Sequence, residues 1–190
     1  MLSEIRIYFE GDRSLRPGFA AFFRDLKSEA AKRRCRLVLI AAGGNPEDDF
    51  RTALEMHSTA WNIMLRDSEG PYNSSLLAGW NPSLAESIFW MVEAMEAWFH
   101  ADKDALQRYY QSGFRRNALR ANPRVEEIRK RDLLDGLHAA TKDTTKGRYH
   151  KTKHAPALLE YIDPTLVRRA APNCNRLFDA ILARLTTTDA

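Results

Sequence analysis

Cysteine is scarce in this chain, and long hydrophobic runs are missing. The 190 residues include two cysteines, Cys35 and Cys174, which lie far apart in the sequence. Two such cysteines exclude a disulfide scaffold and a cysteine-based zinc site, and they suit a reducing cytosol. No run approaches the roughly 18 apolar residues of a membrane span, and the first residues have a strand-like pattern rather than that of a signal peptide. We therefore expect a cytoplasmic protein without a membrane partner.

Glycine-rich nucleotide-binding motifs are also missing. Gly43 and Gly44 follow a strand-like run and precede a helical pattern, but no Gly-x-Gly-x-x-Gly motif is present. A Gly-x-x-x-x-Gly-Lys-Ser/Thr motif is absent as well. The sequence therefore argues against a dinucleotide-binding fingerprint and against ATP hydrolysis by a P-loop.

The composition is that of a globular protein whose charge is unevenly distributed. Hydrophobic residues make up 44% and charged residues 28%, which excludes wholesale disorder. Residues 1–102 hold 11 Lys and Arg against 15 Asp and Glu, whereas residues 103–190 hold 18 against 10. This asymmetry indicates cation binding by the first part and polyanion binding by the second. The alternative is that both parts simply present solvated charged faces.

Apolar runs alternate with helical patterns in the first 110 residues. The runs predict strands over residues 5–9, 37–41, 61–65 and 88–92. The 3.6-residue spacing predicts helices over residues 17–33, 46–57 and 95–110, with a loop at 70–83. Strands that alternate with helices predict an α/β fold with a mainly parallel, four-stranded sheet covered on both faces.

Residues 111–190 contain no convincing strand. Helical patterns occupy residues 125–140, 156–161, 164–171 and 176–185, and the segment 141–154 between them is polar, basic and aperiodic. We therefore expect residues 1–110 to form an α/β core. Residues 111–190 are expected to form a helical, basic extension that packs on this core as part of one globular unit.

Acidic residues follow three of the predicted strands. Glu10 ends the first, Asp67 and Glu69 follow the third, and Glu96 follows the fourth, with Glu93 beside it. Ligands of parallel α/β sheets bind at the carboxyl ends of the strands, and residues two apart in extended chain project to the same side. Carboxylates without a Cys or His ligand set suit Mg²⁺ or Mn²⁺. Any one of these acids alone is better explained as a solvated loop residue, so their joint placement carries the hypothesis.

The segment 141–154 holds five Lys and Arg against one Asp. Basic side chains with an interleaved aromatic residue are suited to phosphate contact and base stacking. The predicted nucleic-acid contacts are Lys142, Lys146, Arg148, Tyr149 and Lys151, where Tyr149 either stacks on a base or packs to hold the loop. The alternative is a solvated loop whose Lys146 and Arg148 pair with acids such as Asp163 or Glu160.

Several motifs in the chain resemble those of a known bacterial family. They are Ile7-Tyr8-Phe9-Glu10-Gly11, Asp67-Ser68-Glu69-Gly70-Pro71, Met95 to Asp102, Asn122-Pro123 and Lys146-Gly147-Arg148-Tyr149-His150-Lys151. Over nearly its whole length the chain resembles the family called domain of unknown function 4276 (DUF4276), which has a Toprim-like core. It is also similar to RloB-like proteins and to Old-type Toprim nucleases.

The resemblance implies metal-dependent phosphoester chemistry on a Toprim-like core. Glu10 would take the place of the Toprim glutamate, as general acid/base or metal ligand. Asp67 and Glu69 would take the place of the metal-binding pair, and Glu96 would be a further acid of the same site. Glu69 departs from the Toprim pattern, which has Asp there, so its carboxylate lies one methylene farther from the backbone.

We therefore expect a Mg²⁺- or Mn²⁺-dependent nuclease that cleaves RNA or DNA with one or two metal ions. The resemblance further implies an effector that works with a separate ATPase in antiphage defence. One alternative is a non-catalytic, Toprim-shaped binding subunit of an ATPase complex, which Glu69 in place of Asp favours. A phosphotransferase or phosphatase on a small nucleotide is another, although the length of the basic segment argues against it.

Overall fold

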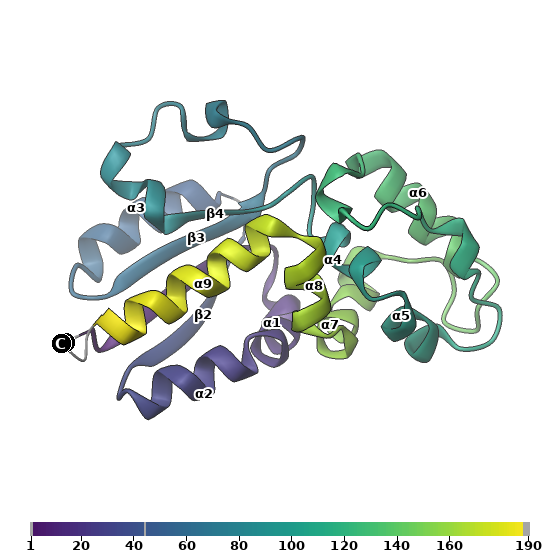
Figure 1. Ribbon diagram of the computed structural model, residues 1–190, viewed down its shortest axis with the longest axis horizontal. Helices are drawn as coiled ribbons and strands as arrows, with labels where there is room; N and C mark the ends of the chain where they lie inside the picture. The colour runs from purple at the N-terminus through teal and green to yellow at the C-terminus, as the bar shows by residue number, and fades with distance from the viewer. Residues whose placement is uncertain (1, 44, 188–190) are drawn as a thin grey trace.

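A four-stranded parallel sheet forms the centre of the computed structural model, which describes residues 2–43 and 45–187 (Figure 1). The strands are β1 (Glu4–Glu10), β2 (Arg36–Ala42), β3 (Trp61–Asp67) and β4 (Ile88–Met91). Their order is β2-β1-β3-β4, and each neighbouring pair is parallel. The predicted α/β class is confirmed, and the carboxyl ends of all four strands meet at one edge.

Helices connect the first three strands. Helices α1 (Arg16–Phe22) and α2 (Arg24–Lys32) lead from β1 to β2, and α3 (Pro46–Met56) leads from β2 to β3. The sequence predicted one helix over 17–33, but the backbone leaves helical geometry at Phe23 (φ −93°, ψ 16°). The ring of Phe23 is fully buried and packs against Phe22 and Phe178. The predicted loop at 70–83 contains a 3₁₀ helix, Ser74–Leu77, and a second one, Pro82–Ser87, follows it.

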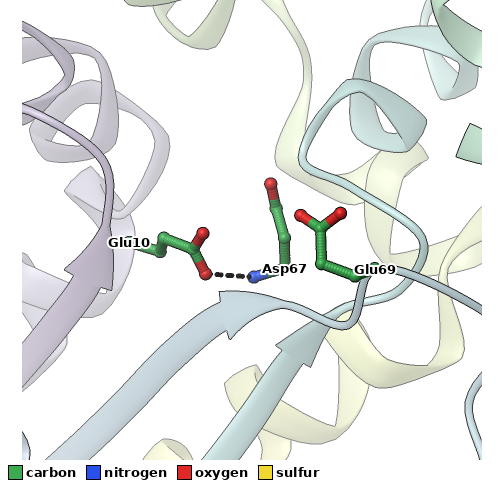
Figure 2. A group of neighbouring side chains, drawn as sticks. All are labelled: Glu10, Asp67 and Glu69. Atoms are coloured by element: carbon green, nitrogen blue, oxygen red, sulfur yellow. Dashed lines mark hydrogen bonds between the residues drawn. The ribbon is translucent and has the colours of Figure 1, made fainter. Parts of the chain in front are cut away.

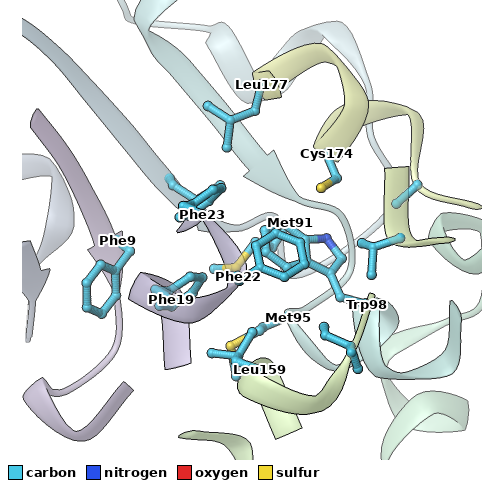
Figure 3. Packing of buried hydrophobic residues seen from close by; sticks show 14 of the residues in the cluster. Phe9, Phe19, Phe22, Phe23, Met91, Met95, Trp98, Leu159, Cys174 and Leu177 are labelled. Carbon is cyan, nitrogen blue, oxygen red and sulfur yellow. The ribbon is translucent and has the colours of Figure 1, made fainter. Parts of the chain in front are cut away.

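The alternation of side chains along β1 separates two hydrophobic cores. Ile5, Ile7 and Phe9 point into the larger core, whereas Tyr8 belongs to the smaller core on the α3 side. In the larger core, Trp98 stacks on Phe22 at 4.8 Å between ring centroids (Figure 3). Both faces of the sheet are therefore covered, as expected of parallel strands.

The chain after β4 is helical. The helices are α4 (Glu96–Ala101), α5 (Lys103–Tyr110), α6 (Lys130–Thr141), α7 (Lys151–Tyr161), α8 (Pro164–Ala170) and α9 (Pro172–Thr186). The single helix predicted over 95–110 is broken at Asp102, where the backbone leaves helical geometry (φ −122°, ψ 78°). The Asp102 side chain caps α5 by accepting from the Ala105 amide at 2.9 Å. Helix α7 begins at Lys151, earlier than predicted, and contains Pro156 in its interior.

The C-terminal helices pack directly on the α/β part. Helix α9 contacts β4 and α2, and α7 contacts α1. The approach of α7 to α1 needs Gly18, because a Cβ there would lie 2.4 Å from the Pro156 carbonyl oxygen. Helices α5, α6 and α7 gather beyond the sheet edge at which β4 ends (Figure 1). Among the described residues, no helix is long and apolar enough to span a bilayer.

Candidate metal centre

Glu10 is the last residue of β1 and reaches across to the end of β3. Its Oε2 accepts a hydrogen bond from the Asp67 amide at 3.1 Å (Figure 2). The chain turns away at once because Gly11 adopts a φ of +132°, and a Cβ at this position would lie 2.4 Å from Leu15 Cδ1. The glycine turn therefore leaves the Glu10 carboxylate at the sheet edge while the chain proceeds to α1.

Asp67 ends β3 and is the most deeply placed acid of the cluster, with 2% of its surface exposed. Its Oδ1 accepts from the Met95 amide at 2.8 Å, and its Oδ2 accepts from Lys151 Nζ at 3.2 Å. Burial raises the pKa of Asp67 to about 6, against the opposing effect of Lys151, and the charges of Glu96 and Glu10 add to the rise. A buried carboxylate with this pKa is suited to bind a cation, which relieves the cost of its charge.

Glu69 stands in the turn after β3 with a left-handed backbone, φ +58°. Non-glycine residues adopt this conformation at a cost, so the surrounding structure must hold it. Here the Ser68 hydroxyl donates to the Gly70 carbonyl and accepts from the Glu93 amide at 2.8 Å, which ties this turn to the one after β4. The Glu69 carboxylate binds Lys130 Nζ, with oxygens at 2.6 and 2.5 Å.

The three carboxylates converge as the sequence predicted. Glu10, Asp67 and Glu69 each offer an oxygen, and these oxygens lie within 4.8 Å of one another. Two oxygens on opposite sides of a Mg²⁺ ion lie roughly 4.2 Å apart. The Glu69 side chain is 55% exposed, so it has room to close this small difference once it is released from Lys130. The donor set, three hard oxygens, fits Mg²⁺ or Mn²⁺.

Two lysines from the C-terminal part pair with two acids of this cluster, and Arg66 of β3 lies 3.8 Å from the third, Glu10. Lys130 is the first residue of α6 and Lys151 is the first residue of α7. A cation at a helix N-terminus is unfavourable unless an acid compensates. Burial lowers the pKa of Lys151, but Asp67, Glu96 and Glu10 outweigh this effect and leave the pKa raised.

The sequence alone did not identify Lys130 as a residue of this site, and it predicted only nucleic-acid contact for Lys151. The missed signal lies in the helical pattern of residues 125–140. Lys130 stands in the run Arg129-Lys130-Arg131 at the helix start, where the macrodipole disfavours positive charge. Such a run indicates that an acid from elsewhere in the chain lies against it.

Two further acids, Glu93 and Glu96, follow β4 and bind to the C-terminal part rather than to the cluster of three. Glu96 is 1% exposed, and its Oε1 accepts from the Tyr149 hydroxyl at 2.8 Å. Burial and the Glu96 charge hold the pKa of Tyr149 well above its ordinary value. Glu93 accepts from the Lys130 amide at 2.7 Å and so caps α6, which has no cap of its own.

A comparison with known families places the chain. A family model described as "Domain of unknown function (DUF4276)" matches residues 13–182. The chain belongs to this family. The matched range includes Asp67, Glu69 and both lysines, while Glu10 lies just before it. No curated protein matches the chain significantly, and no solved structure does so either.

The predicted nucleic-acid contacts of this DUF4276 protein occupy three different environments. Lys142 and Arg148 line a hollow of about 320 Å³ together with His138, whose Nδ1 lies 2.9 Å from an Arg148 nitrogen. Lys146 lies over the Tyr109 ring at 4.7 Å. Lys151 belongs to the acid cluster.

Tyr149 has 4% of its surface exposed, so the structure has it packed inside rather than displayed for stacking. Its amide also donates to the Thr141 hydroxyl at 2.7 Å. Within the described part of the chain, neither Lys146 nor Arg148 forms an ion pair with Glu160 or Asp163. Lys142, Lys146 and Arg148 remain exposed, and their contact with nucleic acid stays a prediction.

Proposed function

We propose that this protein is a metal-dependent nuclease that cleaves phosphodiester bonds in RNA or DNA. The observation that carries the proposal is the convergence of Glu10, Asp67 and Glu69 at the carboxyl edge of the sheet. The resemblance to Toprim nucleases supports it, because Glu10 and Asp67 match acids of that pattern and Glu69 stands where the pattern has Asp. Bound Mg²⁺ would supply an activated water and stabilise the charge that develops on the phosphate.

The chain's own residues have separate parts in this proposal. Asp67 and Glu69 hold the ion, and Glu10, whose carboxylate is partly exposed, either shares it or moves the proton of the attacking water. With a cation held by Asp67, Lys151 Nζ would be released from this carboxylate and could neutralise a phosphate oxygen. The exposed cations Lys142, Lys146 and Arg148 follow the phosphate backbone away from the site.

The second candidate is a non-catalytic binding subunit. The ion pairs of Lys130 with Glu69, of Lys151 with Asp67 and of Arg66 with Glu10 favour it, because each of the three acids then has a cationic partner without any metal. In that case the acids serve to attach the C-terminal helices to the sheet. The two candidates differ in what happens when a single acid is removed.

The test is cleavage of labelled RNA and DNA by the purified protein with Mg²⁺ or Mn²⁺, and with EDTA. We expect cleavage only with the ion, and its loss in Glu10→Ala and Asp67→Ala while the circular dichroism spectrum is unchanged. Asp104→Ala, which removes an exposed carboxylate paired with Arg116, is the matched control and should cut normally. Full activity of both cluster variants would contradict the nuclease proposal and favour the binding-subunit function.

We further propose, from the resemblance alone, that the nuclease acts with an ATPase partner in antiphage defence. The protein itself has no P-loop, so the partner would supply ATP hydrolysis. If an ATPase gene neighbours that of this protein, co-expression of the two should lower phage plating, and Asp67→Ala in the same pair should restore it. Equal phage plating with wild type and variant would contradict the defence role and would have no bearing on the proposed cleavage activity.

A further inference from the structure

A groove of about 540 Å³ lies beside the acid cluster. It is lined by the turn after β3, the end of β4 and the segment before α6, and its apolar lining comes from Pro71, Val92 and Pro172. The volume falls within the roughly 300–1,000 Å³ of small-ligand pockets. Neither the sequence motifs nor the proposed metal chemistry accounts for this groove.

The groove and the acid cluster are joined through Glu93 and Lys130. Glu93 lines the groove and accepts from the Lys130 amide at 2.7 Å. The side chain of Lys130 binds Glu69. A ligand in the groove therefore lies next to whatever the three carboxylates hold.

Tyr72 presents an unused ring to this groove. It is 43% exposed, one of the large hydrophobic side chains that the fold leaves in solvent. Among residues 2–43 and 45–187, no ring, cation or hydrogen-bonding group is paired with the Tyr72 side chain. An exposed, unpartnered aromatic ring at the rim of an apolar groove is a stacking platform.

Arg129 supplies an unpaired positive charge at the same groove. It is exposed, and in the described part of the chain no carboxylate forms an ion pair with it. The acids of the lining are already bound: Glu126 accepts from the Asn173 amide and side chain at 2.9 and 2.8 Å, and Glu127 pairs with Arg124 at 3.2 Å. The hydrogen bonds of Glu93 and Glu126 come from amide groups and do not cancel a carboxylate charge, so Arg129 is the one lining cation, among the described residues, that is left to bind a phosphate.

We propose that this groove binds one unpaired nucleobase, stacked on Tyr72, with the adjoining phosphate on Arg129, and that the substrate is single-stranded RNA or DNA. The inference rests on the proposed function, because the scissile phosphate at the carboxylates defines the adjoining nucleotide. A base inside a duplex is stacked and paired, so it cannot reach a ring beside the cleaved phosphate without leaving the helix. The groove therefore selects strands whose bases are already free.

The first experiment measures binding without cleavage. Fluorescence anisotropy in EDTA compares labelled single strands with duplexes of the same sequence. Tyr72→Ala should weaken single-strand binding roughly 5- to 100-fold, the range for loss of one stacked base, and Tyr72→Phe should restore it. Tyr161→Ala, which removes another exposed tyrosine outside the groove, is the matched control and should bind normally.

The second experiment places the base. A series of single strands, each with one abasic position, should show one position that weakens binding to the wild type and leaves binding to Tyr72→Ala unchanged. Arg129→Ala should lower the slope of log affinity against log salt by roughly 0.7. Arg131→Ala, whose side chain already pairs with Asp135, should leave the slope unchanged.

Equal binding of single strands and duplexes, or abasic losses that are the same in wild type and Tyr72→Ala, would overturn the inference. These outcomes are separate from the fate of the nuclease. If the protein binds single strands through Tyr72 but cuts nothing, the groove inference stands and the proposed cleavage function is wrong. If the protein cuts single strands and duplexes alike and Tyr72→Ala does not change binding, the groove inference is wrong and the proposed cleavage function stands.

Discussion

The two sides of the acid cluster are built in different ways. On the sheet side, Glu10 and Asp67 are the last residues of paired strands, so the parallel ladder fixes where their carboxylates start. On the helical side, Lys130 and Lys151 begin two helices that follow long connections. The sheet side is therefore set by backbone pairing, whereas the helical side depends on the acids that it neutralises.

This difference shows which side holds the other. Glu93 accepts from the Lys130 amide at 2.7 Å, and Glu96 accepts from the Tyr149 hydroxyl at 2.8 Å. The acids thus supply the acceptors that the C-terminal part lacks. We infer that the sheet edge would keep its geometry without the lysines, and that the helical side would lose part of its attachment without Glu93 and Glu96.

The largest expected effect comes from removing the charge at the centre of the cluster. The pKa of Asp67 is about 6, above its ordinary 3.8, so the folded state binds this proton more tightly than the unfolded state. The contribution of this tighter proton binding to the free energy of unfolding is fully present below about pH 4 and is lost as the pH rises through 6. Asp67→Asn, which keeps the acceptor for Met95, should therefore raise the free energy of unfolding by roughly 2 to 3 kcal/mol at pH 7.

Chemical denaturation at pH 4 and pH 7 measures this gain. The difference between variant and wild type should be small at pH 4 and full at pH 7. Mg²⁺ should stabilise the wild type and leave the variant unchanged. A variant that is less stable than wild type at both pH values would show that Asp67 is charged at no net cost, and that the ion pair with Lys151 dominates.

The next effect tests the attachment of the basic segment. Tyr149→Phe removes the hydroxyl that donates a hydrogen bond to Glu96, and it leaves the buried Glu96 Oε1 without this donor. We expect a loss of about 1.5 to 3 kcal/mol in the free energy of unfolding. Tyr110→Phe is the matched control, because the buried Tyr110 hydroxyl has no hydrogen-bond partner among the described residues. Equal losses in both variants would mean that the Glu96 contact contributes nothing specific.

The sequence predicts the sheet side far better than the helical side. Alternation and apolar runs locate all four strands, and the acids at their ends follow from the shared carboxyl edge. The breaks at Phe23 and Asp102 were not predicted, because tertiary packing and a local cap decide them. The partners of Lys130 and Tyr149 depend on chain distant in sequence, 61 residues away for Lys130 and 53 for Tyr149, and no local pattern encodes them.

A smaller effect is expected from the exposed cations of the basic segment. The triple variant Lys142→Ala, Lys146→Ala, Arg148→Ala should lower the slope of log affinity against log salt by roughly 2 to 3, at 0.7 to 0.9 per lost phosphate contact. The variant Arg24→Ala, Lys27→Ala, whose exposed residues lie on α2, is the control. A salt titration with an unchanged slope in the triple variant would show that these side chains form only a solvated face.

The smallest effect is expected at the outer lysine. Lys130 and Glu69 are both partly exposed, so Lys130→Ala should change the free energy of unfolding by less than about 1 kcal/mol. Because Lys130 competes with a cation for Glu69, its removal should strengthen Mn²⁺ binding a few-fold in calorimetry. Weaker Mn²⁺ binding in the variant would mean that Lys130 positions Glu69 for the ion instead of competing with it.

The most direct test of the metal centre is a crystal structure with Mn²⁺, located by its anomalous scattering. The account predicts at least one peak among Glu10, Asp67 and Glu69, with oxygens at roughly 2.1 to 2.2 Å, and the amines of Lys130 and Lys151 moved off their carboxylates. If no peak appears there at saturating Mn²⁺ and both ion pairs remain closed, the three acids are the structural anchor of the C-terminal helices and not a metal site.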